Sequence, residues 1–305
     1  PFHLFAPERK HGIALYSKRV FIMDDCADLM PPYLSFIKGV VDAPDLNLNV
    51  SREILQHNTL VKNIRKNLVK KVLELLAGLD KDKYEQFYAE FGPIFKSGVS
   101  ADFENREKIG GLLRYKTTKS DGQWISLADY VSRMQTDQND IYYITGENLT
   151  MLANSPHLER LKDKDYEVLL MNDPIDEWVI RDLNEFDKKP FKSAEKGDLD
   201  GQAVDDKKKE SFGPLFEFLK TSLDDKVKEV KPSTHLKDSV ACLTGDVYDM
   251  SAFMEKILRA TGQNVPQTKR ALELNMDHPL LTKIRQVFEK DREAAVLKDY
   301  SQLLY

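Results

Sequence analysis

Hydrophobic residues recur at three- and four-residue steps in the segment LNLNVSREILQHNTLVKNIRKNLVKKVLELL, residues 46–76. This spacing brings the apolar side chains to one side of a helix, so it predicts an amphipathic helix. Ser51 is a suitable N-terminal cap, because its hydroxyl can accept a hydrogen bond from a free backbone N–H group. The predicted apolar stripe comprises Ile54, Leu55, Val61, Ile64, Leu68, Val72 and Leu75.

Shorter apolar runs elsewhere predict strands that alternate with helices. GIALYSKRVFIMDD, residues 12–25, alternates between apolar and polar positions and then becomes continuously apolar, which predicts a strand. DIYYITG and YEVLLMN, residues 140–146 and 166–172, also predict strands, and a helical pattern follows each of them. This alternation is typical of an α/β layer with parallel strand pairing.

The polar segment at residues 187–213 contains few apolar residues and is interpreted as a connector between domains. Beyond it, further helical and extended patterns predict a smaller α+β region. One of its helices lies in DMSAFMEKILRATG, where Gly262 would end it. The expected fold class is therefore α/β (α+β).

The composition narrows the function classes. Of the 305 residues, 41% are hydrophobic and 31% are charged, which is typical of a globular protein with a charged surface. The net charge of −5 argues against nucleic-acid binding, which needs a basic surface. No apolar run approaches the roughly 20 residues that a membrane-spanning helix needs. Two isolated cysteines, Cys26 and Cys242, form no disulfide framework and no zinc-ligand spacing, so a cytoplasmic location is expected.

Both ends of the chain resemble cuts through a longer protein. The chain begins PFHLFAPERKHG without an initiator methionine and ends AAVLKDYSQLLY, an amphipathic run without a cap. We therefore expect it to be a fragment.

The start of the helix near Ser51 carries two informative polar residues. Arg52 and Gln56 are four residues apart, so both would project from one face, away from the apolar stripe. Positive charge is unusual at a helix N-terminus, where the backbone already attracts anions. Arg52 could hold a terminal phosphate through a forked pair of hydrogen bonds, or supply charge to phosphoryl transfer in trans. The simpler alternative is an ordinary surface arginine.

Several blocks of sequence resemble the middle domain of the heat-shock-protein-90 chaperone family. Their residues are most similar to those of its bacterial members. The blocks are LYSKRVFIMDD, YLSFIKGVVDAPDLNLNVSREILQ, DYVSRM, IYYITGE, SPHLERL and VLLMNDPIDEW. They follow one another in the family's order, and LNLNVSREILQ is among the family's most specific signatures. The resemblance covers nearly the whole chain and becomes looser beyond Phe212.

The resemblance implies a layered α-β-α middle domain at residues 1–195, followed by a truncated, smaller α+β C-terminal domain at 212–305. The middle domain would consist of a large α/β part at 1–80, a short helical connector at 81–118 and a small α/β part at 119–195. The large part would carry the arginine loop. The family's ATP-binding domain and its last dimerisation helices would lie outside this chain.

The resemblance also assigns roles around Arg52. In the family a separate N-terminal domain binds ATP with Mg²⁺, and an arginine of the middle domain reaches the γ-phosphate. By position that arginine is Arg52, which Gln56 assists, while Asn49 and Ser51 shape the loop. ATP would be a cofactor of the full-length protein, and no bound cofactor or metal is expected on this chain alone.

Exposed apolar residues near this loop would dock the ATP-binding domain. By resemblance these residues are Phe21 and Leu46. Ordinary core burial is an equal alternative for Phe21, because that residue lies in an apolar strand.

Two further places suggest binding of unfolded client proteins. The resemblance puts Glu177 and Trp178 on a surface that faces the cleft of a dimer, although Arg181 departs from the polar amide expected nearby. It also matches an amphipathic helix whose side chains would line the same cleft: Met250, Met254, Ile257 and Leu258. Thioether side chains repack easily and suit a binder of many partners, whereas a Met/Leu stripe at helical spacing is otherwise typical of a core.

The leading interpretation is a chaperone fragment that binds unfolded or partly folded proteins and does not hydrolyse ATP by itself. Its expected partners are client proteins, the N-terminal ATP-binding domain, co-chaperones and, in the full-length homodimer, a second copy. The alternative is a structural or adaptor fragment that only docks onto the ATP-binding domain or a co-chaperone. An autonomous phosphotransfer enzyme is disfavoured, because the chain has no nucleotide-binding motif.

Overall fold

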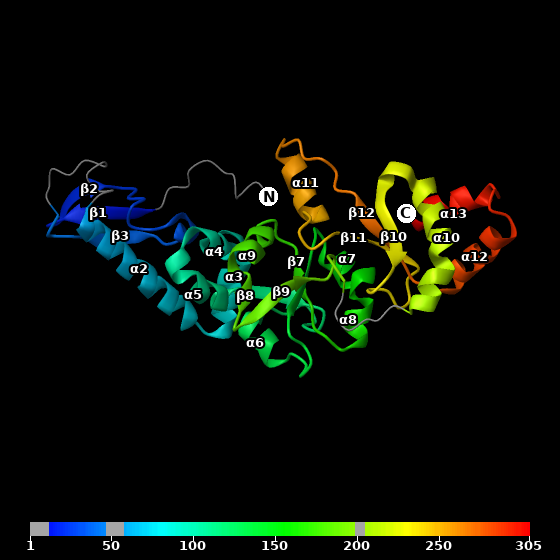
Figure 1. The fold of residues 1–305 in the computed structure, drawn as a ribbon. Helices are drawn as coiled ribbons and strands as arrows, with labels where there is room; N and C mark the ends of the chain where they lie inside the picture. The colour runs from blue at the N-terminus through cyan, green and yellow to red at the C-terminus, as the bar shows by residue number, and fades with distance from the viewer. Residues whose placement is uncertain (1–11, 47–57, 199–204) are drawn as a thin grey trace. The chain divides into compact units, whose positions relative to one another are not determined.

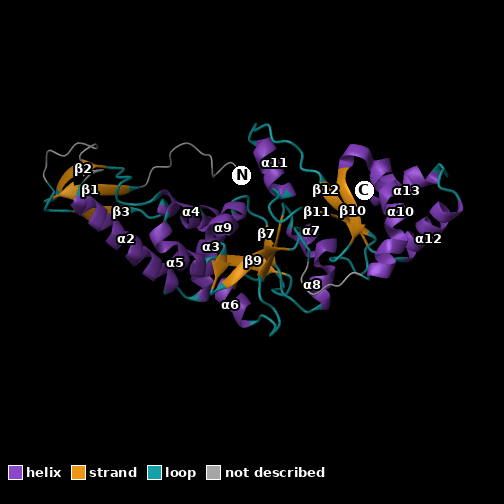
Figure 2. Ribbon diagram, viewed as in Figure 1, coloured by secondary structure: helices purple, strands orange, loops and turns teal. Residues whose placement is uncertain are grey.

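The structure is a computed structural model in which residues 12–46, 58–198 and 205–305 are described. These residues combine helices with parallel and antiparallel strands, which confirms the α/β (α+β) fold class (Figure 2). Two compact units make up the chain. Unit 1 comprises Pro1–Tyr115, Trp124–Asp129 and Ile175–Lys188, and unit 2 comprises Lys116–Gln123, Tyr130–Pro174 and Lys189–Tyr305.

A three-stranded sheet in unit 1 has the strand order β2-β1-β3 (Figure 1). Its middle strand β1 (Ile13–Ser17) is antiparallel to β2 (Val20–Met23) and parallel to β3 (Gly39–Asp42). Residues of β1 alternate between buried and half-buried, as expected for a strand with one covered face.

The single strand predicted from GIALYSKRVFIMDD is in fact a hairpin, so that prediction was wrong. Its turn consists of Lys18 and Arg19, which have φ angles of 51° and 67°. Two-residue hairpin turns need positive φ angles, and their usual residues are Asn and Gly, so a Lys–Arg pair gives no turn signal. The Arg19 N–H group donates a hydrogen bond to Asp42 Oδ2 at 3.1 Å and helps to hold the turn.

Helices form most of the rest of unit 1. The long ones are α2 (Thr59–Ala77) and α3 (Lys81–Lys96). The shorter elements are η1 (Pro32–Leu34), α4 (Gly98–Ala101), η2 (Phe103–Asn105), α5 (Arg106–Leu112), β5 (Ile125–Ser126), α9 (Asp176–Leu183) and β8 (Glu185–Phe186). Two elements begin in unit 1 and end in unit 2, namely β4 (Arg114–Thr117) and α6 (Leu127–Ser132).

Helix α2 (Thr59–Ala77) confirms an amphipathic helix over these residues, but beyond Val61 it buries a different row of side chains from the predicted one. Its buried residues are Val61, Val69, Leu73 and Leu76, whereas Leu75 is 62% exposed. The buried face is rotated from the predicted stripe by about one residue. Spacing alone does not choose between two adjacent apolar rows on one helix.

The first sheet of unit 2 centres on β6 (Ile141–Thr145). This strand pairs in parallel with both β7 (Leu169–Met171) and β9 (Lys189–Ser193), and the end of β4 is antiparallel to β7. The parallel pairing predicted from the alternation of strands and helices is thus confirmed. The helical elements between β6 and β7 are α7 (Leu149–Ala153), η3 (Pro156–Leu158) and α8 (Glu159–Asp163).

The second sheet of unit 2 has the order β10-β12-β11. Its middle strand β12 (Arg270–Leu274) is parallel to β10 (Val227–Pro232) and antiparallel to β11 (Ala241–Thr244). The helices of this region are α10 (Asp206–Leu223), η4 (Asp224–Lys226), α11 (Ala252–Ala260), α12 (Pro279–Lys290) and α13 (Val296–Leu304).

The segment predicted to be a connector, residues 187–213, contains β9 and the first part of α10. Asp205 caps α10, since its Oδ1 accepts a hydrogen bond from the Lys207 N–H group at 2.9 Å. The polar composition misled the prediction, because β9 is exposed or half-buried along most of its length and α10 starts with charged residues that face solvent.

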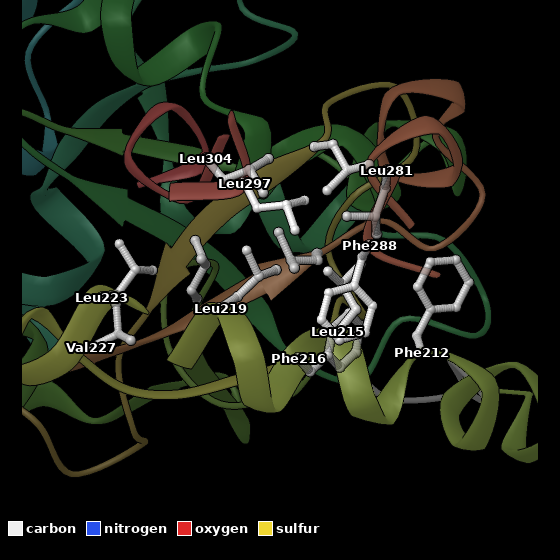
Figure 3. Packing of buried hydrophobic residues seen from close by; sticks show 13 residues of the cluster. Phe212, Leu215, Phe216, Leu219, Leu223, Val227, Leu281, Phe288, Leu297 and Leu304 are labelled. Atoms are coloured by element: carbon white, nitrogen blue, oxygen red, sulfur yellow. The ribbon is translucent and has the colours of Figure 1, made fainter. Parts of the chain in front are cut away.

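An apolar cluster fills the space between the second sheet and its helices. Figure 3 shows side chains of α10 pointing toward those of α12 and α13. The cluster comprises Phe212, Leu215, Phe216, Leu219, Leu223, Val227, Leu272, Leu274, Leu281, Ile284, Phe288, Leu297 and Leu304. Its members are separated by up to 92 positions in the chain, so this core ties the start of the region to its end.

Two leucines of α13 provide a matched test of this packing. Leu297 is fully buried and Leu303 is 82% exposed. Leu297→Ala is expected to lower the free energy of unfolding by about 2–5 kcal/mol, because it removes packed methyl groups and leaves a cavity. Leu303→Ala should change it by less than about 0.5 kcal/mol. Urea unfolding followed by circular dichroism measures both variants, and equal effects would contradict this assignment of the core.

Candidate functional site

The residues predicted to act on a phosphate lie outside the described part of the chain. Asn49, Ser51, Arg52 and Gln56 all fall within residues 47–57, so their roles remain predictions. Helix α2 begins at Thr59, and its N-terminal cap is Asn58, whose Oδ1 accepts a hydrogen bond from the Leu60 N–H group at 2.8 Å. The prediction that Ser51 caps this helix was therefore wrong, because the backbone at Asn58 is extended.

The two residues predicted to dock another domain differ in exposure. Phe21 on β2 is 54% exposed, and its ring meets Tyr16 edge-on at 5.6 Å between ring centroids. Core burial of Phe21 is therefore excluded. Leu46 is only 4% exposed, and its carbonyl oxygen accepts a hydrogen bond from Ser17 Oγ at 2.6 Å. The predicted exposure of Leu46 was wrong, because this residue is buried and its backbone is held to Ser17 of β1.

Helix α9 carries Glu177 and Trp178 in its first turn, and both side chains are half-buried. Its inward side includes the buried Val179. Arg181 is exposed, and its Nε lies 2.8 Å from Asp182 Oδ1. The Arg181 guanidinium lowers the pKa of the Asp182 carboxyl group below its usual range. The unexpected arginine is thus paired with its neighbour on the same helix.

A buried ion pair that sequence analysis missed anchors the start of α9. Lys96 Nζ lies 2.7 Å from Asp176 Oδ1, and the two side chains are 4% and 1% exposed. The Lys96 ammonium group also lies 4.8 Å from the ring centroid of Tyr115. Removing one partner of such a pair leaves a buried charge without compensation, which is strongly unfavourable. The pair therefore holds the N-terminus of the helix that presents Trp178.

Helix α11 begins and ends with well-formed caps. Ser251 Oγ accepts a hydrogen bond from the Met254 N–H group at 3.0 Å. At the other end Gly262 has a φ of 82°, and its N–H group donates to the Arg259 carbonyl oxygen at 3.0 Å. The Gln263 N–H group donates to the Leu258 carbonyl oxygen at 3.1 Å, which completes a Schellman motif. The helix end predicted at Gly262 is thus confirmed.

The two sides of α11 differ in burial. Phe253 and Ile257 are buried and form the inward side. Met254 and Leu258 are four residues apart and half-buried, and Met250 just before the helix is also half-buried. The predicted surface position of Ile257 was wrong, because this side chain shares the inward row with Phe253 at a four-residue spacing.

Charged residues also fix α11 in place. The buried Glu255 lies 2.8 Å from Arg270 Nη2 through Oε1 and 3.5 Å from Arg259 Nη2 through Oε2. On the outer side, Lys256 Nζ lies 2.6 Å from Glu147 Oε2. The helix is therefore held by ion pairs as well as by apolar contacts.

A second buried carboxylate, Glu273 on β12, lies in a polar cluster that sequence analysis also missed. Its Oε2 accepts a hydrogen bond from Ser233 Oγ at 2.7 Å and lies 2.9 Å from His235 Nδ1. Its Oε1 lies 3.4 Å from Lys231 Nζ. Burial opposes ionisation of Glu273, but the interactions with His235, Ser233 and Lys231 outweigh it and lower the pKa of Glu273 to about 2.

The loop that follows β10 also binds a carboxylate from α8. Three consecutive backbone N–H groups, those of Lys237, Asp238 and Ser239, donate to the side chain of Glu159 at distances of 2.6 to 3.1 Å. Burial raises the pKa of Glu159, but these hydrogen bonds together with the Ser239 hydroxyl lower it overall. Loop 233–239 therefore connects α8 to the second sheet.

Metal and membrane features are limited in the described residues. No group of three or more His, Cys, Asp and Glu side chains there is arranged to hold a metal ion. In the same residues, no helix has both the length and the apolar character to cross a membrane. Cys26 and Cys242 are free thiols.

The family model described as "Hsp90 protein" matches residues 1–305. Because this match covers the whole chain, it identifies the class of protein. The chain belongs to the Hsp90 family of chaperones.

Bacterial relatives specify the type. The chain is 46% identical over 318 residues to the chaperone protein HtpG of Geobacter metallireducens and also 46% identical to that of Geobacter sulfurreducens. It is 47% identical to the chaperone protein HtpG of Alkalilimnicola ehrlichii. Each comparison covers 100% of this chain and 48 or 49% of the relative, so the chain spans about half the length of the curated relatives it matches. The predicted similarity to bacterial family members is confirmed.

The buried His157 of η3 leads us to expect that the protein is less stable in mild acid than at neutral pH. Its ring meets His235 edge-on at 5.7 Å, and burial, together with the charge of His235, lowers the pKa of His157 to about 4. An unfolded histidine has a pKa of about 6.5, so between these values the unfolded chain binds a proton that the folded chain does not. Stability therefore falls as the pH is lowered through this window.

We expect the free energy of unfolding to fall by about 2 kcal/mol from pH 7 to pH 5 through this group. Glu273 adds a further loss only below about pH 4.5, because its pKa is depressed in the folded state. Urea unfolding of the wild type and His157→Asn at pH 7, 6 and 5 measures the effect. A pH dependence that is the same in both proteins would contradict this role of His157.

Proposed function

We propose that this chain is the client-binding middle and C-terminal part of an ATP-dependent chaperone. The proposed middle domain spans residues 1–195 and the truncated C-terminal domain spans 212–305. Membership of the Hsp90 family supports the proposal. The observation that carries it is the helix α11, which leaves Met254 and Leu258 half-exposed while other side chains hold it in place.

This helix is suited to form a binding surface, because the residues that hold it in place are not the ones that are accessible to solvent. Phe253, Ile257 and Glu255 supply the buried contacts, so Met250, Met254 and Leu258 are free to contact another chain. Ile257 supports the surface from beneath. Methionine side chains adapt to partners of different shape, which is what binding of many unfolded proteins requires.

Glu177 and Trp178 form a second proposed client contact. Trp178 is half-buried on α9, and a large aromatic side chain with part of its surface in water is a favourable anchor for an apolar partner. The buried pair of Lys96 and Asp176 supports this proposal, because it fixes the turn that carries both residues.

In the full-length protein we propose that Arg52 stabilises the γ-phosphate of ATP with Mg²⁺ held by the N-terminal domain. Gln56 would assist, and Asn49 and Ser51 would shape the loop. Phe21 is the proposed docking residue for that domain. It has exposed apolar neighbours in the same sheet, Val20 at 50% and Val40 at 68%.

The proposed partners are unfolded clients, the ATP-binding domain, co-chaperones and a second copy of the full-length protein, in the cytoplasm. The alternative is a fragment that only docks onto the ATP-binding domain or a co-chaperone. The partly exposed Met254 and Leu258 favour client binding, because docking at Phe21 gives no reason for apolar side chains on α11 to stay in contact with solvent.

Client binding predicts that this chain slows the aggregation of a thermally unfolded model protein. The paired change Met254→Ser with Leu258→Ser should reduce the suppression at least about threefold, because it removes apolar contact area. Trp178→Arg should also weaken it. Light scattering measures the effect, and Met151→Ser, at a residue 75% exposed on α7, is the matched control. No suppression by the wild type, or equal suppression by all variants, would leave the adaptor alternative.

The assignment of Arg52 predicts that this chain alone shows no ATP hydrolysis, whereas the full-length protein does. In the full-length protein, Arg52→Ala should lower kcat at least about tenfold, because it removes a positive charge from the transferring phosphoryl group. Arg65→Ala on α2 is the control and should leave kcat unchanged. Phosphate release measures both, and turnover by the purified chain alone that disappears in Arg52→Ala would overturn the assignment.

A further inference from the structure

The turn between β11 and α11, whose backbone can be followed in Figure 1, carries one side chain that is almost entirely exposed to solvent. Tyr248 is 99% exposed, the largest exposed fraction among the large hydrophobic side chains of the described residues, and the preceding Val247 is 64% exposed. Water contact over a whole tyrosine ring and an adjacent valine forgoes favourable burial. Two such residues in succession need an explanation.

The turn that holds Tyr248 is well ordered by hydrogen bonds. The Asp249 N–H group donates to the Asp246 carbonyl oxygen at 3.0 Å, and the Asp246 N–H group donates to Asp249 Oδ2 at 2.8 Å. Asp246 also forms an ion pair with Lys228. These contacts fix the backbone on both sides of Tyr248.

A neighbouring segment supports the turn from the side. The Gly197 N–H group donates to the Gly245 carbonyl oxygen at 2.9 Å, and the Gly245 N–H group donates to the Glu195 carbonyl oxygen at 3.1 Å. Gly197 has a φ of 65°, and a Cβ atom there would lie 2.7 Å from Val247 Cγ2. Val247 thus packs closely on Gly197 with one side of its side chain, and the turn forms a platform that is held on both sides and carries Tyr248.

Position and charge indicate what the platform would bind. Tyr248 lies two residues before Met250, at the edge of the surface proposed for clients. Three carboxylates, those of Asp246, Asp249 and Glu229, lie close enough to Lys228 to stabilise its charge, and Lys196 is the second lysine beside the turn, with its Cγ 3.8 Å from the place that a Cβ of Gly245 would take; carboxylates therefore outnumber ammonium groups here. A local excess of negative charge next to an aromatic ring favours a cationic side chain over an anionic one, through Coulomb attraction and cation–π contact.

We propose that Tyr248 is an anchor for unfolded segments in which apolar side chains lie next to Lys or Arg. The inference rests on the proposed client binding and adds to it a residue and a preferred chemistry. Tyrosine suits this role because it brings a large contact area and loses little conformational freedom on binding. The hydrogen-bonded turn lowers the cost further, because the backbone that carries the ring does not have to become ordered on binding.

The test uses two fluorescein-labelled peptides with identical leucine and phenylalanine residues, one flanked by lysines and the other by glutamates. Fluorescence anisotropy gives the Kd of each peptide for the 305-residue chain. The wild type should bind the lysine peptide more tightly. Tyr248→Ser should weaken that binding about fivefold or more, Tyr248→Phe should retain most of it, and the control Met151→Ser should leave it unchanged.

The outcomes separate this inference from the proposed function. If Met254→Ser with Leu258→Ser abolishes binding and Tyr248→Ser matches the wild type, client binding stands and the role of Tyr248 is wrong. If Tyr248→Ser weakens both peptides equally, the preference for cationic segments is wrong. If the wild type binds neither peptide and does not suppress aggregation, both proposals fall. Unchanged thermal unfolding of Tyr248→Ser shows that a loss of binding is local.

Discussion

The arrangement of unit 2 depends on a buried carboxylate that needs charged and hydrogen-bonding partners in the core. Glu273 lies on the middle strand of the second sheet and is completely buried. An isolated charge there would cost many kcal/mol, so the surrounding chain has to supply partners. Lys231 comes from the neighbouring strand, but Ser233 and His235 come from the loop that follows it, so this loop must fold back over the sheet. Because the same loop offers its N–H groups to Glu159, neutralising one buried charge also fixes the position of α8.

Buried charges play the same part at both helices that carry proposed client contacts. Arg270 lies at the start of β12, on the same strand as Glu273, and pairs with the buried Glu255 of α11. In unit 1, Lys96 pairs with Asp176 at the start of α9. Apolar packing is tolerant of small rotations, whereas an ion pair at 2.7 or 2.8 Å in a dry environment admits few geometries. Each pair therefore sets the rotation of a helix about its axis and decides which side chains reach the surface.

The features that the sequence predicts correctly are those determined by residues close together in the chain. Local signals succeed: the end of α11 at Gly262 is set by residues within one turn of it, and the strands β6 and β7 show in their own apolar runs. A turn with positive φ angles cannot be predicted where Gly and Asn are missing from it, as at Lys18 and Arg19. The pairing of Lys96 with Asp176 leaves no trace in a single sequence, because the partners are 80 residues apart and each resembles an ordinary surface charge. The prediction for α11 lies between these cases, since helical spacing identifies the stripe but does not show that Ile257 is buried while Leu258 is only half-buried.

Because buried and partly exposed residues alternate along α11, a binding surface on this helix can change without loss of the fold. The fully buried contacts that hold the helix involve Phe253, Glu255 and Ile257, while Met254 and Leu258 are only partly buried. We therefore expect substitutions at Met254 or Leu258 to lower the free energy of unfolding less than substitutions at Phe253 or Ile257. The same reasoning applies to Tyr248, whose turn is held by backbone hydrogen bonds and by Val247 on Gly197, without any need for burial of the tyrosine ring. Because support and contact reside on separate side chains, the surface around α11 can vary in chemistry while the strand and helix beneath it stay the same.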